Sequence, residues 1–476
     1  MYLKDIIREE NRMNILNFLF NHFHVMKDAL ISGERRISYH SLCNNVIGFS
    51  KSINSTSDVI VIYLANSIEY VVAYFAVLLS GKKLLLVNPM YPASEVKKFL
   101  DLVHADTLIT NIENPLFDDY SIMCPVVVSD GMEYECPNIP DLADEGTIII
   151  PTSGTTGEAK LVMLTHRNIC TNVDDINEAY CDTKETDVEM IILPMTSVFC
   201  NTTQLLVPIS KKMAIDIWTG GFNMTGIIKN MAEHKVSFCQ MVPAILRLFI
   251  VFYKKMGIEL PSFKRTTVGG EPISIKELKE FSAQLSPIKV LQGYGMTEAS
   301  PVISSQTYFD DITFGSSGHL MKHVEIRIDP IEEGRSEGLI FIKGPSVCKQ
   351  TYDGTLLVDE NGWLNTGDIG FIDDKQELYI CGRKKNMIVV GGMNVYPEEV
   401  EGVIKAFPGV GDVLVFGEDN ELKGEIVKAK ITLLKDIDLY ELKKHCSEQL
   451  PLYKVPDSID VVTVLDKTYS NKIKRF

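Results

Sequence analysis

The sequence lacks the residue patterns that mark several common classes of protein. None of its ten cysteines forms a CxxC pair, and its nine histidines form no HExxH motif. These absences argue against a disulfide framework, a structural zinc site and a catalytic metal held by imidazoles. Scattered single cysteines are typical of reduced thiols in a cytosol.

Long hydrophobic runs and excess positive charge are also missing. The longest apolar run, residues 70–80, is too short to cross about 30 Å of hydrocarbon, and acidic residues stand where a signal peptide needs an apolar core. With 63 acidic against 47 basic side chains, the net charge of −16 argues against nucleic acid as a partner. We therefore expect a cytoplasmic protein with no transmembrane segment.

From residue 59 onward, apolar strand patterns alternate with helical ones. Strands are predicted at 59–65, 83–89 and 106–111, with helices at 67–81 and 92–105 between them. This alternation is typical of parallel sheets covered by helices. Around 320–380 the pattern changes to short strands joined by Gly and Asp turns, which indicates a small β-barrel-like part.

The last 90 residues or so read as a separate α+β unit. A helix opens at Pro397, strands follow at 412–417 and 425–434, and a second helix spans 439–450. We place the boundary near Gly382, with a large N-terminal domain at 1–382 and a small mobile C-terminal domain at 383–476. At 476 residues the chain is long enough for about three domain-sized units, so this division is reasonable.

One loop has a composition suited to binding phosphate. It follows a β-branched strand and consists of Thr152, Ser153, Gly154, Thr155, Thr156 and Gly157, with Lys160 shortly after. Glycines let backbone N–H groups turn inward, hydroxyls add donors and lysine adds charge. The spacing is not that of a Walker A loop. On composition alone, a polar hairpin turn between two strands is an equally good interpretation.

The whole stretch from 147 to 168 closely resembles the YTSGTTGxPKGVxxTH signature of the adenylate-forming superfamily, and further motifs recur in the same order. They are Gly269-Gly270-Glu271-Pro272, Gly293-Tyr294-Gly295-Met296-Thr297-Glu298, Thr366-Gly367-Asp368, Gly382-Arg383-Lys384-Lys385 and the terminal LDKTYSNKIKR. The resemblance covers nearly the whole chain. The motif sequences are most similar to those of acyl-CoA synthetases, which are acid–thiol ligases that form AMP.

The resemblance implies that ATP and Mg²⁺ bind here, and it assigns roles. The loop 152–157 with Lys160 would hold the β- and γ-phosphates. The adenine would contact Gly270, Glu271 and Pro272, and the α-phosphate would contact Thr297. Glu298 would hold Mg²⁺, since a carboxylate suits a hard cation. Asp368 would accept hydrogen bonds from the ribose, and Arg383 would add a donor to the ribose region. Tyr294, which stands between Gly293 and Gly295 in the sequence, would stack on adenine. Lys472 would lie between the carboxylate and the α-phosphate.

The acid pocket implied by the family would be lined by Ser197, Phe199, Cys200, Asn201, Val242, Gly269, Gly293 and Met296. No acidic residue stands near Ser197 to hold a buried ammonium, so fatty or aryl acids are favoured over amino acids. Several positions depart from the family pattern, namely Ala159, Leu161, Thr196, Leu339 and Asn471. They indicate a divergent member and leave the shape of the pocket open.

The expected reaction is ATP-dependent activation of an acid to an acyl-adenylate, followed by transfer to a phosphopantetheine thiol. Coenzyme A and a separate acyl-carrier protein both present that thiol, and the sequence does not decide between them. The Gly391-Gly392 loop would line the thiol tunnel, and Lys385 would be the hinge about which the small domain rotates. A non-catalytic nucleotide sensor is the alternative from a different class.

Overall fold

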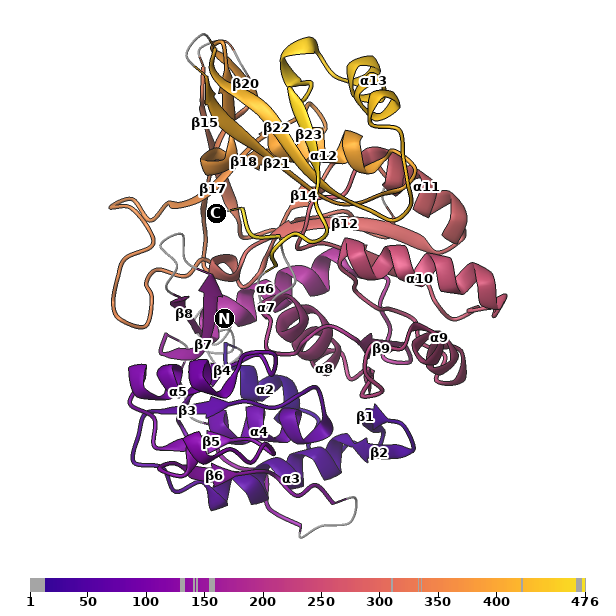
Figure 1. Cartoon of the computed structure of the whole chain (residues 1–476). Helices are drawn as coiled ribbons and strands as arrows, with labels where there is room; N and C mark the ends of the chain where they lie inside the picture. The colour runs from indigo at the N-terminus through magenta and orange to yellow at the C-terminus, as the bar shows by residue number, and fades with distance from the viewer. Residues whose placement is uncertain are drawn as a thin grey trace.

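The computed structural model describes residues 13–128, 133–139, 142, 144–153, 159–309, 311–332, 334, 336–420, 423–467 and 473–475. These residues form two helix-covered sheets, an antiparallel sheet of four strands and a small α+β region at the C-terminus (Figure 1). This is the fold class predicted from the sequence.

The first sheet is mostly parallel and lies near the N-terminus. Its six strands run in the order β6-β5-β3-β4-β7-β8, and only the β7–β8 pair is antiparallel. Their bounds are β3 Val59–Ile62, β4 Lys83–Leu86, β5 Thr107–Ile109, β6 Ser121–Met123, β7 Gly146–Ser153 and β8 Ala159–Thr165. The β7–β8 hairpin carries the loop that the sequence singles out as a phosphate site.

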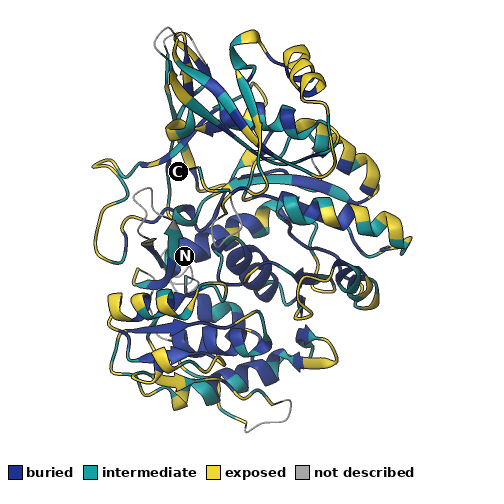
Figure 2. Cartoon of the chain, in the orientation of Figure 1, coloured by how far each residue is buried: buried dark blue, intermediate teal, exposed yellow. Residues whose placement is uncertain are grey.

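Helices cover both faces of this sheet, which is why β3 and β4 are apolar on both sides. Figure 2 shows the central helix α4 among the buried elements. It begins where the Ser67 side chain accepts a hydrogen bond from the Tyr70 N–H, and it ends just before Gly81 at φ +73°. The helices are α2 Ile15–Phe20, α3 Tyr39–Ser52, α4 Ile68–Leu79 and α5 Ala93–Leu102.

The second sheet is longer and carries most of the motif residues. Strands β2-β1-β10-β9 continue through single bridges at Phe238 into β11-β12-β13-β14. The bounds are β1 Asp28–Ser32, β2 Arg35–Ser38, β9 Val188–Ile191, β10 Ala214–Ile217, β11 Arg265–Val268, β12 Lys289–Gly295, β13 Val302–Ser305 and β14 His319–Leu320.

Each face of the second sheet packs against its own set of helices. Helices α9 Met224–Glu233, α10 Pro243–Met256 and α11 Ile275–Leu285 share one apolar cluster with the sheet. The apolar cluster on the other face includes four helical elements, namely α6 His166–Ala179, the short α7 Val198–Cys200, the π-helix η2 Asn201–Leu206 and α8 Val207–Ser210. Strand β12 lies between these two layers, so its end is held from both sides.

The antiparallel sheet leads directly into the small domain. It runs β15 Glu325–Pro330, β16 Gly338–Lys343, β17 Leu364–Ile372 and β18 Leu378–Arg383 in that spatial order. The short helix η4 Lys384–Asn386 follows. The small domain then contains β19 Ile388–Val390, β20 Met393–Val395, α12 Pro397–Lys405, β21 Val410–Asn420, β22 Gly424–Leu433, α13 Leu439–Gln449 and β23 Ser458–Val461.

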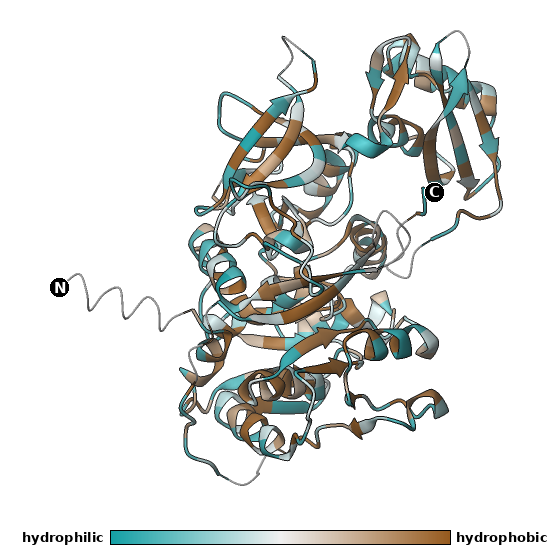
Figure 3. Cartoon of the chain, turned by 90° about the vertical axis from the view of Figure 1, so that its left-hand side faces the viewer, coloured by the Kyte–Doolittle hydropathy of each residue, from teal (hydrophilic) through white to brown (hydrophobic). Residues whose placement is uncertain are grey.

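The small domain has its own hydrophobic core, formed by buried residues from Ile388 to Leu450. It stands beside the rest of the chain, with hydrophobic segments along its strands (Figure 3). A separate core is what an independent domain requires; the division after Gly382 itself stays a prediction. Among the described residues, no helix is both long and apolar enough to cross a membrane.

Close packing at the end of β12 explains one motif glycine and generates the first test. A Cβ atom at Gly295 would lie 2.1 Å from the Pro301 carbonyl oxygen, which accepts the Met296 N–H at 3.0 Å. Gly295→Ala must therefore displace the backbone next to Thr297. We expect a loss of about 3 kcal/mol in the free energy of unfolding, measured by urea denaturation.

Gly33→Ala is the matched control. Gly33 has φ +58° and nothing within 4 Å of the added Cβ, so only backbone strain of about 1 kcal/mol is expected. Equal losses in the two variants would show that the packing at Gly295 is not tight.

Candidate active site

The phosphate-loop prediction falls mostly outside the described residues. Gly154, Thr155, Thr156 and Gly157 are not described, nor is the side chain of Ser153. What the structure describes is the pair of strands on either side. Thr152 lies opposite Lys160, and its hydroxyl donates to the Lys160 carbonyl oxygen at 3.3 Å. Lys160 is exposed at the start of β8.

Charged residues from four separate segments meet around Glu298. This residue lies on the short helix η3 (Thr297–Ala299), which directly follows β12, and its carbonyl oxygen accepts the Cys348 N–H at 2.7 Å. Burial raises the pKa of the Glu298 carboxyl, while the nearby charges of Arg383 and Lys160 lower it and that of Asp368 raises it. Lys160, Asp368 and Arg383, which the sequence predicts for phosphate and ribose, are therefore all within electrostatic range of Glu298.

Asp368 is a buried carboxylate held on both oxygens. Arg383 Nε lies 2.8 Å from Oδ1, and the Tyr294 hydroxyl donates to Oδ2 at 2.6 Å. Strands β17 and β18 create the ion pair, because Asp368 is directly opposite Arg383 in their register. Burial, and then the charge of Asp368, raises the pKa of Tyr294 well above its ordinary value.

The contact between Tyr294 and Asp368 is absent from the sequence interpretation, which gave Tyr294 the task of stacking on adenine. In the structure its hydroxyl donates to Asp368 and so holds that carboxylate, while the stacking of its ring on adenine stays a prediction. The two residues are 74 positions apart. No local pattern in either motif carries a signal for such a contact.

Four of the predicted pocket residues come together in one place. A Cβ on Gly269 would lie 3.1 Å from the Gly293 carbonyl oxygen and 3.8 Å from Phe199 Cζ, and one on Gly270 would lie 3.7 Å from Val242 Cγ1. We call Phe199, Val242, Gly269 and Gly293 the acid wall. The two glycines present backbone where any other residue would present a side chain.

Other predicted pocket residues point elsewhere. Asn201 is buried and its Oδ1 accepts the Tyr74 hydroxyl at 3.1 Å, while the Cys200 thiol faces the Leu193 carbonyl at 3.4 Å. Both contacts are made with core groups, and the assignment of these two residues to the pocket lining stays a prediction. Ser197 caps α7, with its Oγ accepting the Cys200 N–H. Met296 is half-buried and packs against the large apolar core.

The adenine turn lies where the two domains approach each other. Gly270 has φ +83°, Glu271 is half-buried and Pro272 is exposed. A Cβ added to Gly402 of α12 would contact Ser274 at 3.6 Å, and Glu271 is close enough to Lys405 to raise its pKa. Burial, the larger effect, lowers the pKa of Lys405.

Lys385 and Arg475 of the terminal segment also lie close to each other. Burial lowers the pKa of Lys385, with added repulsion from Arg383 and Arg475. Arg475 pairs with Glu401 at 2.8 Å and with Glu398 at 3.5 Å, both on α12. Lys472 and Asn471 lie outside the described residues.

The Gly391-Gly392 loop is the tip of the β19–β20 hairpin. Both residues are exposed, with φ of +57° and +81°, as a two-residue hairpin turn requires. Asn394 Nδ2 donates to Glu332 Oε1 at 3.0 Å in the turn after β15. In this orientation the hairpin therefore contacts the antiparallel sheet.

Within the described ranges, no group of three or more His, Cys, Asp or Glu side chains is placed to hold a metal ion. His319 and His323 are four positions apart, but the first ring bonds to the Gln376 carbonyl and the second to Asp175.

A separate cavity of about 320 Å³ lies near the acid wall but not at the charged cluster. It is lined mainly by apolar residues, among them Ile192, Trp218, Phe222 and Ile245, and Asn66 adds a polar side chain. Ile245 is close to the start of α10, one turn after Val242. None of the charged motif residues borders this cavity.

Comparison with known proteins agrees with the resemblance. Residues 21–352 match the family model of the AMP-binding enzyme, and residues 399–472 that of the AMP-binding enzyme C-terminal domain. A 4-coumarate–CoA ligase from Pinus taeda is 27% identical over 464 residues, 90% of this chain and 86% of the relative. A long-chain-fatty-acid–CoA ligase from Escherichia coli is 27% identical over 498 residues, 93% of this chain and 88% of the relative.

Solved structures of CoA synthetases are also similar to this chain. The o-succinylbenzoate CoA synthetase of Bacillus subtilis, in complex with its acyl-adenylate intermediate, superimposes with a TM-score of 0.84 at 25% identity, covering 96% of this chain and 97% of that one. The same enzyme with ATP and a magnesium ion gives 0.83 at 25% identity, with 96% and 98% coverage. This chain belongs to the AMP-binding enzyme family, as an adenylate-forming enzyme of the acyl-CoA synthetase type.

Proposed function

We propose that this protein activates a carboxylic acid, fatty or aryl, with ATP to give an acyl-adenylate and pyrophosphate, and then transfers the acyl group to the thiol of coenzyme A. The observation that carries the proposal is that Asp368 and Arg383 form an ion pair and that both, together with Lys160, are close enough to Glu298 to shift its pKa. Each comes from a different motif, and each has the charge that its expected role needs.

The first step brings two anions together, and this explains the positive charges. A carboxylate oxygen attacks the α-phosphorus of ATP, forming a new P–O bond as the bond to pyrophosphate breaks. Repulsion between the two anions is the main barrier that positioned cations can lower. Lys160 would act on the outer phosphates and Lys472 on the approaching carboxylate, while Asp368 holds the ribose so that the α-phosphate is in line.

Glu298 is the residue fitted to hold Mg²⁺. Its carboxyl is half-buried beside two cationic side chains, and its pKa is raised by burial, so a further cation would favour the ionised form. A bound Mg²⁺ neutralises phosphate charge. Around it, Glu298 and Thr297 would position the nucleotide, since both lie on the short helix that the end of β12 fixes.

Coenzyme A is the favoured acceptor because the similar curated proteins are CoA ligases. A carrier protein presents the same phosphopantetheine thiol and is the alternative for the second step. The exposed Gly391-Gly392 tip suits a loop that approaches the site when the small domain rotates, since two glycines leave space for a narrow chain.

The adenylation step is tested by acid-dependent, Mg²⁺-dependent exchange of labelled pyrophosphate into ATP. Lys472→Ala should lose about 10²–10³ in that exchange, the scale of one preorganised electrostatic contact. Thioester formation from supplied acyl-adenylate should be nearly unchanged, because that step no longer joins two anions.

Equal loss in both steps would assign Lys472 to folding or to another role. If the wild type binds ATP but shows no exchange across fatty, aryl and amino acids, the nucleotide-sensor alternative replaces the enzyme.

The hinge is tested by Lys385→Pro. Proline fixes φ near −65° and restricts the preceding Lys384, so the torsions that a domain rotation needs become unavailable. The turn at Lys384–Asn386 keeps its hydrogen bond in this variant. That bond runs from the Met387 N–H to the Lys384 carbonyl oxygen, so it does not use the N–H that proline lacks. If proline holds the small domain in the adenylating orientation, pyrophosphate exchange should persist while thioester formation falls by at least about 10².

Lys385→Ala is the matched control, since it removes the charge and leaves φ free. Both rates should stay close to wild type in that variant. A parallel fall of both rates in Lys385→Pro would contradict a hinge at this position.

A further inference from the structure

Helix α12 of the small domain lies directly against the start of α11 in the large domain. Ser274 is the N-cap of α11, and a Cβ atom added to Gly402 of α12 would lie 3.6 Å from the Ser274 Cβ. That distance is ordinary van der Waals contact, so the two helices approach as closely as a residue without a side chain allows. We call this approach of Gly402 to Ser274 the helix contact.

Charged side chains stand beside the helix contact on both helices. Lys405 follows Gly402 by three residues, and Glu277 follows Ser274 by three residues, a spacing that puts each pair on one side of its helix. Glu277 accepts two hydrogen bonds from Arg247 of α10, from Nε at 2.6 Å and from Nη2 at 3.2 Å. The large domain therefore holds a carboxylate next to the end of α12.

Lys405 is half-buried, and most of the charged groups around it are acidic. Burial has the largest effect on the pKa of Lys405 and lowers it, and the charge of Arg247 lowers it further. Glu277, Asp412 and Glu271 raise it. Glu271 belongs to the turn predicted to contact adenine, and it precedes the proposed hinge, as Glu277 does. Lys405 thus brings a small-domain cation close to two carboxylates of the large domain.

The last described residues of the chain pair with one another to form the base of a hairpin. Lys467 is bridged to Ile473, and the Lys474 N–H donates to the Asp466 carbonyl oxygen at 2.8 Å. Lys472 immediately precedes Ile473 in the sequence. Its reach is therefore limited by where this hairpin base is held.

Both stretches of the hairpin base are fixed to the small domain. Lys467 pairs with Asp412 of β21 at 2.7 Å. Arg475 pairs with Glu401 of α12 at 2.8 Å and donates to the Val415 carbonyl oxygen of β21 at 3.2 Å. Helix α12 and the hairpin base are consequently tied together, so the place of α12 on the large domain sets the point from which the terminal lysine acts.

We propose that Lys405 is a positioning residue for the adenylation step, because it docks α12 on the start of α11 and so places Lys472 relative to the nucleotide. The inference rests on the proposed function and adds a residue that lies outside the family motifs. Lys405 contacts no substrate and acts through Lys472. Rotation about the hinge would carry it away from Glu271 and Glu277, so its charge favours one orientation of the small domain over the other.

Two features favour the adenylating orientation for this arrangement. The docked helix brings Lys405 close to Glu271 of the adenine turn, and the same helix holds the hairpin base. The Gly391-Gly392 tip, by contrast, is exposed, and Asn394 next to it contacts Glu332 of the turn after β15. The predicted thiol loop therefore lines no tunnel in this orientation.

Lys405→Met removes the charge and keeps the length of the side chain. Pyrophosphate exchange should fall at least about tenfold because Lys472 is misplaced, while thioester formation from supplied acyl-adenylate should not fall. Lys405→Arg should restore exchange, because it returns the charge. Both rates are measured on the same full-length protein, with urea denaturation to confirm folding. Unchanged exchange, or an equal fall of both rates, overturns the inference.

A double-mutant cycle tests whether Lys405 acts through Lys472. Lys405→Met added to Lys472→Ala should lower exchange by less than about threefold, since the contact that Lys405 positions is already gone. If the two losses multiply in full, Lys405 has a separate effect and the proposal fails.

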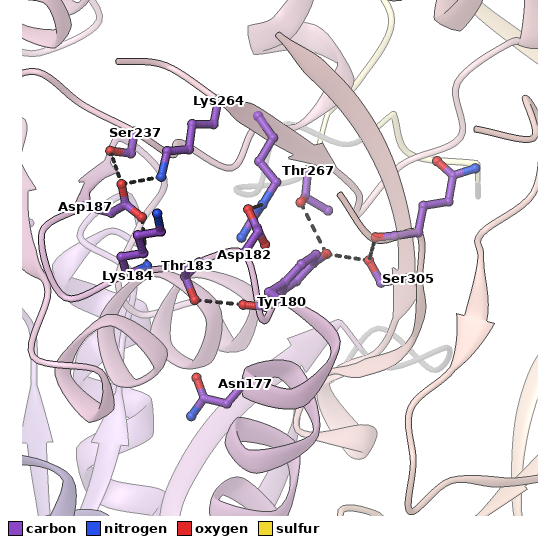
Figure 4. Close-up of polar contacts among 12 residues, drawn as sticks. Asn177, Tyr180, Asp182, Thr183, Lys184, Asp187, Ser237, Lys264, Thr267 and Ser305 are labelled. Carbon is purple, nitrogen blue, oxygen red and sulfur yellow. Dashed lines mark hydrogen bonds and ion pairs between the residues drawn. The ribbon is translucent and has the colours of Figure 1, made fainter. Parts of the chain in front are cut away.

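Lys264→Met is the matched control for loss of a half-buried lysine. Figure 4 shows Asp187 between Ser237 and Lys264, and the Lys264–Asp187 ion pair of 2.6 Å lies wholly within the large domain. This variant should lower the free energy of unfolding and leave both half-reactions close to wild type. A selective loss of exchange here would contradict the proposal, because exchange would then report stability and not position.

The size of the residue at 402 gives a second test that leaves every charge in place. Gly402→Ala adds a Cβ that the helix contact accommodates, so both rates should stay close to wild type. Gly402→Leu must lift α12 from α11 and should lower exchange at least about tenfold while sparing thioester formation. Equal effects of the two variants would contradict close docking.

A disulfide between the two helices tests the docking without relying on activity. The distance of 3.6 Å between the two Cβ positions lies within the range for a disulfide, about 3.5–4.5 Å. Mild oxidation of the Gly402→Cys/Ser274→Cys double variant should give this cross-link, identified by mass spectrometry. Adding Lys405→Met should slow its formation by about threefold or more. The oxidised protein should keep exchange and lose thioester formation until a reductant is added.

Failure of the proposed function looks different from failure of this inference. If no acid supports exchange in the wild type, the rate predictions fail together and the cross-link decides. Equal rates of cross-link formation with and without Lys405→Met then contradict the docking role of Lys405.

Discussion

The ion pair between Asp368 and Arg383 is the contact on which the rest of the site depends. It joins the last two strands of the antiparallel sheet at 2.8 Å, one residue before the hinge helix begins. The Tyr294 hydroxyl adds the end of β12 to the same carboxylate. Because Asp368 is buried, an unpaired charge there would be costly, so the pairing fixes β12, β17 and the start of the hinge relative to one another.

The same arrangement would let the proposed rotation of the small domain leave the nucleotide site in place. Asp368 and Tyr294 lie in β17 and β12, before the proposed hinge. Arg383 is the last residue of β18, and the small domain follows within five residues with its own core. Rotation about Lys385 would then change which small-domain loop faces the nucleotide without disturbing the ribose contacts.

Local structure was largely predictable from the sequence. The helix after Ser67, its end before Gly81 and the helix opened by Pro397 follow from capping residues and apolar spacing. The motif glycines were predicted too, and the structure adds the reason for Gly295, whose missing side chain leaves room for the Pro301 carbonyl.

Contacts between distant segments were not predictable. The Tyr294–Asp368 hydrogen bond and the inward turn of Asn201 toward Tyr74 depend on tertiary packing that one sequence does not reveal. Glu189 is an intermediate case. An acidic residue inside the buried strand 188–191 is a signal that sequence analysis could have used, since a buried carboxyl needs partners. Its partners Gln204 and Gln240 carry no such signal.

The central claim is that the acid attacks the α-phosphorus of ATP, and isotope transfer tests it most directly. The acid is supplied with its carboxylate oxygens replaced by a heavy isotope, together with ATP, Mg²⁺ and coenzyme A, and the products are analysed by mass spectrometry. The account predicts one heavy oxygen in AMP and none in pyrophosphate, because the attacking oxygen stays on the α-phosphorus after thiolysis. Heavy oxygen in inorganic phosphate, with ADP as the other product, would contradict it.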